Sequence, residues 1–264
     1  MTKATEVNPE ATEVNPEAAN PEAANPEAPE AALQTVNSEG ALVKPPVVGT
    51  AYITQLLTAI KEDFVAANEG LDMDFVFMGT WLTIDKKGNF VEKDDETVQY
   101  GDTIDVVVGQ GEKRWSAWGL KDSPEDGQLI VACKEKADAD EQLTAWLEAN
   151  PDAAVRYNLD SLGLRYMAFV VPVSTLSAED FPKVYLMSFS PTGTIDYGKY
   201  AMGVFQGKYK LQGIKARTGI NKVVTRLVTI EKTSKKNDWI GIDFKAVGMF
   251  NPADYGLTEQ PVTE

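Results

Sequence analysis

The sequence predicts an α+β fold built around a mostly antiparallel sheet or small barrel, with a few peripheral helices. Three observations predict it. Short apolar runs bounded by turn residues recur along the chain, helical spacing is confined to three separated segments, and two alternating runs near the C-terminus enclose a polar loop. One folded domain is expected over residues 49–250, between an N-terminal tail (1–48) and a short acidic C-terminal tail (251–264).

The N-terminal tail is a drifting repeat. Residues 4–10 and 11–17 both read Ala-Thr-Glu-Val-Asn-Pro-Glu, and shortened copies follow as far as residue 30. The prolines interrupt any helix that the alanines could begin, and few side chains are apolar enough to be buried. The tail is therefore predicted to be disordered, either as an inert solubilising segment or as a docking or spacer arm.

Hydrophobic periodicity locates the elements of the folded part. Apolar residues at helical spacing predict helices over 51–68, 140–149 and 195–211. In the last helix Ile195, Met202, Phe205 and Tyr209 share one face, so these side chains are expected in the core. Strands are predicted over 74–85, from Phe90 onward after a turn at 86–89, and over 103–108, 114–119, 129–133, 166–173, 184–189, 222–232 and 239–247.

Composition excludes most catalytic chemistry. The chain has no histidine and one cysteine, Cys133, so it can form neither a histidine-assisted nucleophile nor a histidine-containing zinc site nor a cysteine-rich metal cluster. No cofactor, no metal and no enzymatic activity are expected.

The longest apolar stretch, residues 167–173, is too short to cross a membrane, and the N-terminus has no signal-like apolar run. These features predict a cytoplasmic protein without a membrane partner.

Positive charge is concentrated near the C-terminus. The chain carries 25 basic and 40 acidic side chains, a formal charge of −15, yet residues 199–245 hold eleven basic side chains against three acidic ones. Such a segment can follow a polyanion while the acidic remainder repels non-specific contacts. The predicted nucleic-acid-binding cations are Lys199, Lys208, Lys210, Lys215, Arg217, Lys222, Arg226, Lys232, Lys235, Lys236 and Lys245.

Aromatic side chains interleave with these cations, and exposed rings can stack on the bases of a single strand. In the last predicted strand Ile240, Ile242 and Phe244 alternate with Trp239, which places Trp239 on the polar side beside the Lys235–Lys236 loop. Trp115 is a second, weaker candidate, since it follows Lys113 and Arg114. The alternative is that the rings belong to the core and the cations are ordinary solvated surface.

The order of predicted strands and helices from Val184 to Lys245 resembles that of bacteriophage-encoded single-stranded DNA-binding and replication-accessory proteins. The similarity rests on the run Val184–Pro191, the helix after it, and the runs Asn221–Lys236 and Trp239–Lys245, and extends over roughly residues 100–250. It implies an OB-like barrel that binds without catalysis, in the cytoplasm of an infected bacterium. The cluster of acids and terminal aromatic with which many such proteins end is absent here.

The leading hypothesis is therefore a non-catalytic protein that binds single-stranded nucleic acid, with DNA favoured over RNA. It would act in DNA replication or recombination, beside other proteins of those processes. The alternative is a phage virion structural protein, a capsid decoration or tail component whose N-terminal arm projects into solvent. Homo-oligomer formation is left open under both hypotheses.

Overall fold

The computed structural model describes residues 51–67, 80–95, 97–120, 122–177, 179–233 and 238–257. All of them belong to one compact unit that spans residues 36–264. The predicted tail of residues 1–48, the first half of the strand predicted over 74–85, and Lys235 and Lys236 lie outside the described residues.

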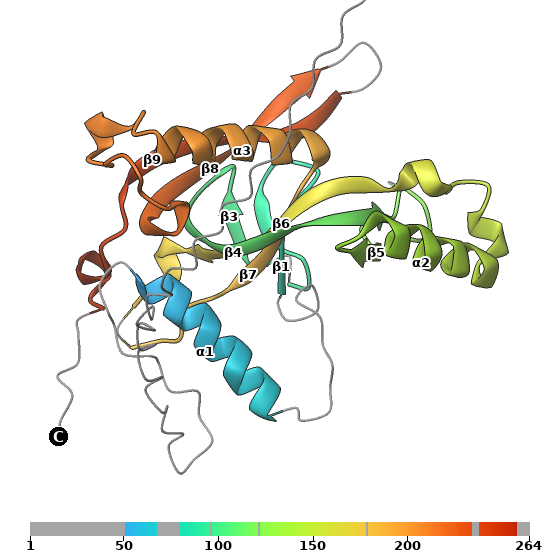
Figure 1. The fold of residues 1–264 in the computed structure, drawn as a ribbon, viewed down its shortest axis with the longest axis horizontal. Coiled ribbons are helices and arrows are strands. Elements are labelled where there is room, and N and C mark those ends of the chain that lie inside the picture. The colour runs from blue at the N-terminus through green and yellow to red at the C-terminus, as the bar shows by residue number, and fades with distance from the viewer. Residues whose placement is uncertain are drawn as a thin grey trace, which may run out of the picture. The chain divides into compact units, whose positions relative to one another are not determined.

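The predicted α+β class is confirmed (Figure 1). The described strands form one sheet in the order β3-β2-β1-β7-β6-β4-β8-β9, with β5 paired to β4, and only β1 and β7 run parallel. The strands are β1 (Thr80–Ile84), β2 (Phe90–Glu92), β3 (Gln99–Gly101), β4 (Thr103–Trp118), β5 (Leu129–Cys133), β6 (Gly163–Pro172), β7 (Tyr185–Phe189), β8 (Val223–Thr233) and β9 (Asp238–Met249). The α-helices are α1 (Tyr52–Ala67), α2 (Lys136–Ala149) and α3 (Pro191–Phe205).

The sheet is curled, which is consistent with an OB-like barrel surrounded by helices. Only Asp102 separates β3 from β4, and its carbonyl accepts a hydrogen bond from the Thr229 amide of β8 at 2.9 Å. The Thr229 hydroxyl donates to the Gly88 carbonyl, 2.8 Å away in the turn before β2. These bonds draw the β2–β3 end of the sheet toward β8, so the sheet encloses one face.

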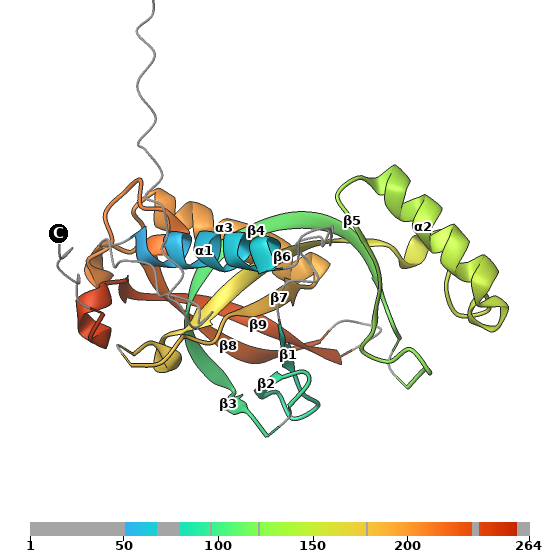
Figure 2. The same ribbon diagram turned by 90° about the horizontal axis from the view of Figure 1, so that it is seen from below.

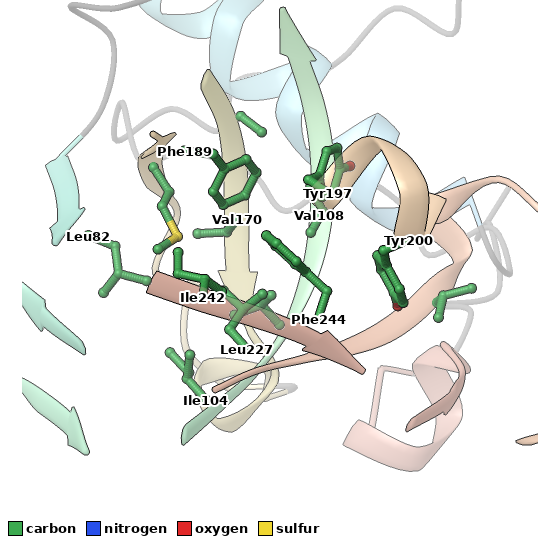
Figure 3. Packing of buried hydrophobic residues seen from close by; sticks show 14 of the residues in the cluster. Leu82, Ile104, Val108, Val170, Phe189, Tyr197, Tyr200, Leu227, Ile242 and Phe244 are labelled. Atoms are coloured by element: carbon green, nitrogen blue, oxygen red, sulfur yellow. The ribbon is translucent and has the colours of Figure 1, made fainter. Parts of the chain in front are cut away.

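Three apolar clusters hold the helices in place. On the enclosed face, Phe244 of β9 packs against Tyr197 and Tyr200 of α3, with ring centroids 5.5 and 5.8 Å apart (Figure 3). The opposite face is covered by α1, where Ile53 and Leu56 are fully buried. A third cluster joins α2 to β5 and to the far part of β4 (Figure 2).

Two predicted strands, 103–108 and 114–119, prove to be one strand of 16 residues, β4. The register shifts between Val108 and Gly111, which is the signature of a β-bulge. A side chain at Gly109 would clash with Leu57 of α1, and one at Gly111 would clash with Tyr166 of β6. The two glycines thus permit close packing within one bent strand, where the sequence had predicted two separate strands.

The prediction for α3 was wrong in its limits and in its buried face. The helix begins earlier because the Ser190 hydroxyl accepts from the Gly193 amide and Pro191 suits the first position. It ends at Phe205, before Gly207, which adopts a left-handed φ of 75°. The core receives the Tyr197 and Tyr200 side, while Ile195, Met202 and Phe205 are 58%, 54% and 52% exposed.

The tyrosine face prevails because its polar atoms find partners and its rings stack. The Tyr200 hydroxyl bonds the buried Thr225 hydroxyl at 2.8 Å, and Tyr197 stacks on Tyr166 with centroids 4.9 Å apart. Tyr209 packs against the same cluster and is partly buried, as predicted.

Two smaller differences concern α2 and the C-terminus. Helix α2 begins at Lys136, one turn before the predicted start, and Lys136 pairs with Asp140 at 2.8 Å. The acidic tail was predicted to begin at residue 251, but a 3-10 helix spans Pro252–Tyr255 and Leu257 is 4% exposed against the α1 cluster. Residues 258–264 lie outside the described part of the chain.

Candidate nucleic-acid interface

The cations predicted to bind nucleic acid fall into two structural regions. One is the α3–β8 connection, residues 206–222, and the other is the β8–β9 hairpin, residues 223–249. The connection folds back on the end of α3, because the Arg217 amide donates to the Phe205 carbonyl at 2.7 Å and the Lys208 amide to the Gly203 carbonyl at 2.9 Å. Ile214, 1% exposed, anchors its middle in the core.

Cations of the connection are exposed and uncompensated. No acidic residue occurs between Asp196 and Glu231 in the sequence. The connection's five cations and Lys199 on the outer side of α3 form no ion pair with any described residue. The carbonyl end of a helix also favours positive charge, so this arrangement is electrostatically compatible with the fold. The six are Lys199, Lys208, Lys210, Lys215, Arg217 and Lys222.

The described cations of the hairpin, in contrast, are paired within the chain. Arg226 donates to both oxygens of Asp105 at 2.7 and 2.9 Å, and this carboxylate raises the pKa of Arg226. Lys232 lies 2.7 Å from Asp196, and Lys245 lies 3.5 Å from Asp243. Each carboxylate cancels much of the charge that a phosphate would meet.

Trp239 stands on the outer side of the hairpin, as the alternation predicted. It is 36% exposed, whereas Ile242 and Phe244 are 8% and 7% exposed in the core. Its cross-strand partner is Lys232, whose stem crosses Gly241; a Cβ at that glycine would lie 2.8 Å from the lysine Cδ. Trp239 is therefore available to a ligand, although its described lysine neighbour is engaged by Asp196.

Trp115 lies away from both regions. It packs against the cluster beneath α2, and the Lys136 ammonium is 5.7 Å from its ring centroid. The other indole of that strand, Trp118, meets Trp81 edge-on at 5.2 Å and has the Arg165 guanidinium 5.8 Å from its ring centroid. The structure does not bring Trp115 together with the basic segment.

Sequence reasoning missed the apolar surface beside the unpaired cations. Met202 and Phe205 on α3 and Leu211 in the connection are 54%, 52% and 100% exposed. The signal was present in the sequence, since Tyr197, Tyr200 and Val204 also recur at helical spacing and compete with Ile195, Met202 and Phe205 for the core. Spacing alone cannot decide between two apolar faces of one helix.

Two open pockets occur in the described part of the chain, and neither is lined by the α3–β8 connection. One, of about 600 Å³, is lined by Tyr100, Asp105, Arg226 and Tyr255, and the Asp105–Arg226 pair forms part of its wall. The second, of about 650 Å³, lies beside α2 and includes Cys133 and Lys134.

Within the described residues, no group of acidic or cysteine side chains is arranged to hold a metal ion. None of the described helices is long and apolar enough to cross a membrane.

Comparison with known proteins adds no relative: no protein-family model, no curated protein and no solved structure matches this chain. Its function has to be argued from its own residues.

Proposed function

We propose that the protein binds single-stranded nucleic acid, with DNA favoured, without catalysing a reaction. The observation that supports this most directly is the acid-free run from residue 197 to residue 230, which presents six exposed cations without carboxylate partners among the described residues. Phosphates of a flexible strand could approach these cations without displacing an internal ion pair. Participation in replication or recombination, in a bacterial host cytoplasm, belongs to the same proposal.

Physical reasons favour a single strand over a duplex. Phe205 is half exposed beside the connection and Trp239 is partly exposed on the hairpin, so unpaired bases could stack on them. A base in a duplex is already stacked and does not present its face. Stacking on one aromatic ring is worth about 1–3 kcal/mol per base, so Phe205 or Trp239 could contribute as much as several phosphate contacts.

The test is the salt dependence of binding to a labelled thymidine oligonucleotide, followed by fluorescence anisotropy. If all six cations meet phosphates, log K should fall with log salt with a slope of about −4, because each contact to a single strand contributes about 0.7. The double variant Lys215→Ala/Arg217→Ala should reduce the slope to about −3. Duplex DNA should bind more weakly at each salt concentration.

A matched control replaces two exposed lysines elsewhere. Lys61 on α1 and Lys113 on β4 form no ion pair with described residues, so Lys61→Ala/Lys113→Ala removes the same charge without touching the connection. Its slope should equal that of the wild type. Absence of binding at low salt, where the phosphate contribution is largest, would refute the proposal.

A structural role in a phage particle is the second candidate, and the exposed apolar residues favour it. Ile195, Met202, Phe205 and Leu211 form more exposed apolar surface than binding to phosphates requires. In a virion component this surface would pack on another subunit. Co-sedimentation with purified particles, together with no response to oligonucleotide, would support this second function over the first.

A further inference from the structure

Exposed apolar side chains gather in two places. Of the ten large hydrophobic residues classed as exposed in the described part of the chain, seven belong to two groups. Four lie on α3 and the connection: Ile195, Met202, Phe205 and Leu211. Three lie around α2: Leu120, Val155 and Leu159. Single exposed apolar residues are ordinary, but groups of this kind mark interaction surfaces.

The two groups have opposite electrostatic surroundings. In the first group, Met202, Phe205 and Leu211 lie in the acid-free run of residues 197–230, which carries seven basic side chains, and Ile195 lies two residues before this run. The second lies in the α2 lobe, residues 120–162, which carries ten acidic and four basic side chains. Asp152 and Asp160 flank Val155 and Leu159, are exposed, and form no ion pair with described residues.

The acidic apolar surface and the basic apolar surface of one chain do not contact each other. Helix α2 and the connection after α3 lie toward opposite ends of the sheet in both ribbon views (Figures 1 and 2). The α2 lobe is anchored at its own end by its apolar cluster, and Arg156 is held there by Glu125 at 2.9 Å. A second copy of the chain, however, presents the complementary surface.

We propose that the protein self-associates head to tail, with the acidic, apolar α2 lobe of one copy docking on the basic, apolar surface of α3 and the connection of the next. Val155 and Leu159 of one copy cover part of the exposed apolar group on α3 and the connection of the next copy. Asp152 and Asp160 of the first copy then face the unpaired cations of the second. Because the two surfaces differ, the contact does not close on itself as a two-fold dimer would, and it propagates into rings or chains. This inference goes beyond nucleic-acid binding and does not depend on it.

The experiment measures the mass of the full chain by light scattering over a range of concentrations, at low and high salt. We expect the average mass to rise past that of a dimer at low salt and to return toward the monomer at high salt, because screening weakens contacts between opposite charges. A chain that stays monomeric at low salt, or an association that stops at two copies, overturns the proposal.

Two variants break one surface each at a nearly fully exposed position. Leu211→Glu places negative charge in the basic surface, and Val155→Lys places positive charge in the α2 lobe; these side chains are 100% and 87% exposed, so the fold should be unaffected. Each variant alone should associate at least tenfold more weakly. An equimolar mixture of the two variants should form heterodimers and no larger species, because the intact α2 lobe of Leu211→Glu can dock on the intact basic surface of Val155→Lys while the other two surfaces are altered. A mixture that remains monomeric contradicts the head-to-tail arrangement.

The control and the distinction from nucleic-acid binding use the same assay. Val247→Lys makes an equivalent change at a 41% exposed position of β9 that belongs to neither surface, and it should associate as the wild type does. Val155→Lys leaves the proposed nucleic-acid surface intact, so it should lose self-association yet bind the thymidine oligonucleotide with wild-type affinity at protein concentrations where the wild type is monomeric. A wild-type monomer that binds oligonucleotide would overturn only the self-association.

Discussion

The α3–β8 connection and the β8–β9 hairpin contain the same kinds of residue but use them differently. Both are basic in sequence, and the prediction treated them as one binding segment. In the hairpin, Arg226, Lys232 and Lys245 each meet a carboxylate within the chain. In the connection, the cations meet none among the described residues. Local charge density therefore does not measure the charge that is available to a ligand.

The difference arises from where the partner acids come from. Asp105 lies on β4 and Asp196 on α3, far from their partners in sequence, and Asp243 lies two residues from Lys245. Antiparallel pairing sets Asp105 directly beside Arg226 in the register. The connection leaves the sheet and folds against the end of α3, where the sequence holds no acid. The hairpin cations are neutralised by three kinds of neighbour, namely a paired strand for Arg226, helix α3 for Lys232 and the same strand for Lys245. The cations of the connection have no such neighbour among the described residues.

The largest expected effect is a loss of stability, and it should differ between a buried ring of the hairpin and an exposed ring on the outer side of α3. Phe244→Ala should lower the free energy of unfolding by about 3–5 kcal/mol, because Phe244 is 7% exposed and packs against three aromatic rings. Phe205→Ala, at a 52% exposed position, should change it by less than about 0.5 kcal/mol. Urea denaturation measures both. Equal losses would mean that the outer face of α3 is also part of the core.

A smaller loss of stability is expected when the hydrogen bond between α3 and the hairpin is removed. Tyr200→Phe leaves the buried Thr225 hydroxyl without its partner and should cost about 1–3 kcal/mol at neutral pH. Burial raises the pKa of Tyr200 to about 12 from its usual 10.

Because ionisation is harder in the folded state, the stability linked to Tyr200 is complete below pH 10 and is lost as the pH rises toward 12. Tyr200→Phe should therefore lose less stability than the wild type between pH 10 and 12, as followed by denaturation at each pH. Burial also raises the pKa values of Tyr185 and Tyr197, so some loss should remain in the variant. A pH dependence identical to that of the wild type would contradict the role of Tyr200.

The smallest effects are expected when one cation of the hairpin and one cation of the connection are each replaced by alanine. Arg226→Ala should reduce stability by up to about 1 kcal/mol, since it breaks a partly exposed ion pair, and should leave the salt dependence of oligonucleotide binding unchanged. Lys222→Ala should do the reverse, with unchanged stability and a salt slope smaller by about 0.7. Denaturation and anisotropy on the same two proteins test this. Equal reductions of the slope would show that the hairpin cations also contact the strand.

Elements with strong local patterns were predictable from the sequence. The single apolar stripe of α1, the bounded run of β5 and the alternation of β9 each have one favourable burial pattern, and the structure confirms all three. The limits of α3 were less predictable, since Pro191 and Gly207 act as start and stop signals that the longer run of apolar residues conceals. The short strand β3 was not predicted as a separate strand, because three residues carry too little pattern.

The sequence by itself determined the α+β class, the placement of most strands, and the concentration of positive charge after residue 197, because periodicity and charge are local properties of the chain. Only the tertiary structure decided that β4 continues through its glycines, that α3 buries its tyrosines, and that the unpaired cations lie in the connection beside exposed apolar residues. Those outcomes depend on which segments meet, and the meeting of Arg226 with Asp105 or of Tyr200 with Thr225 is set by the register of the sheet and the packing of α3.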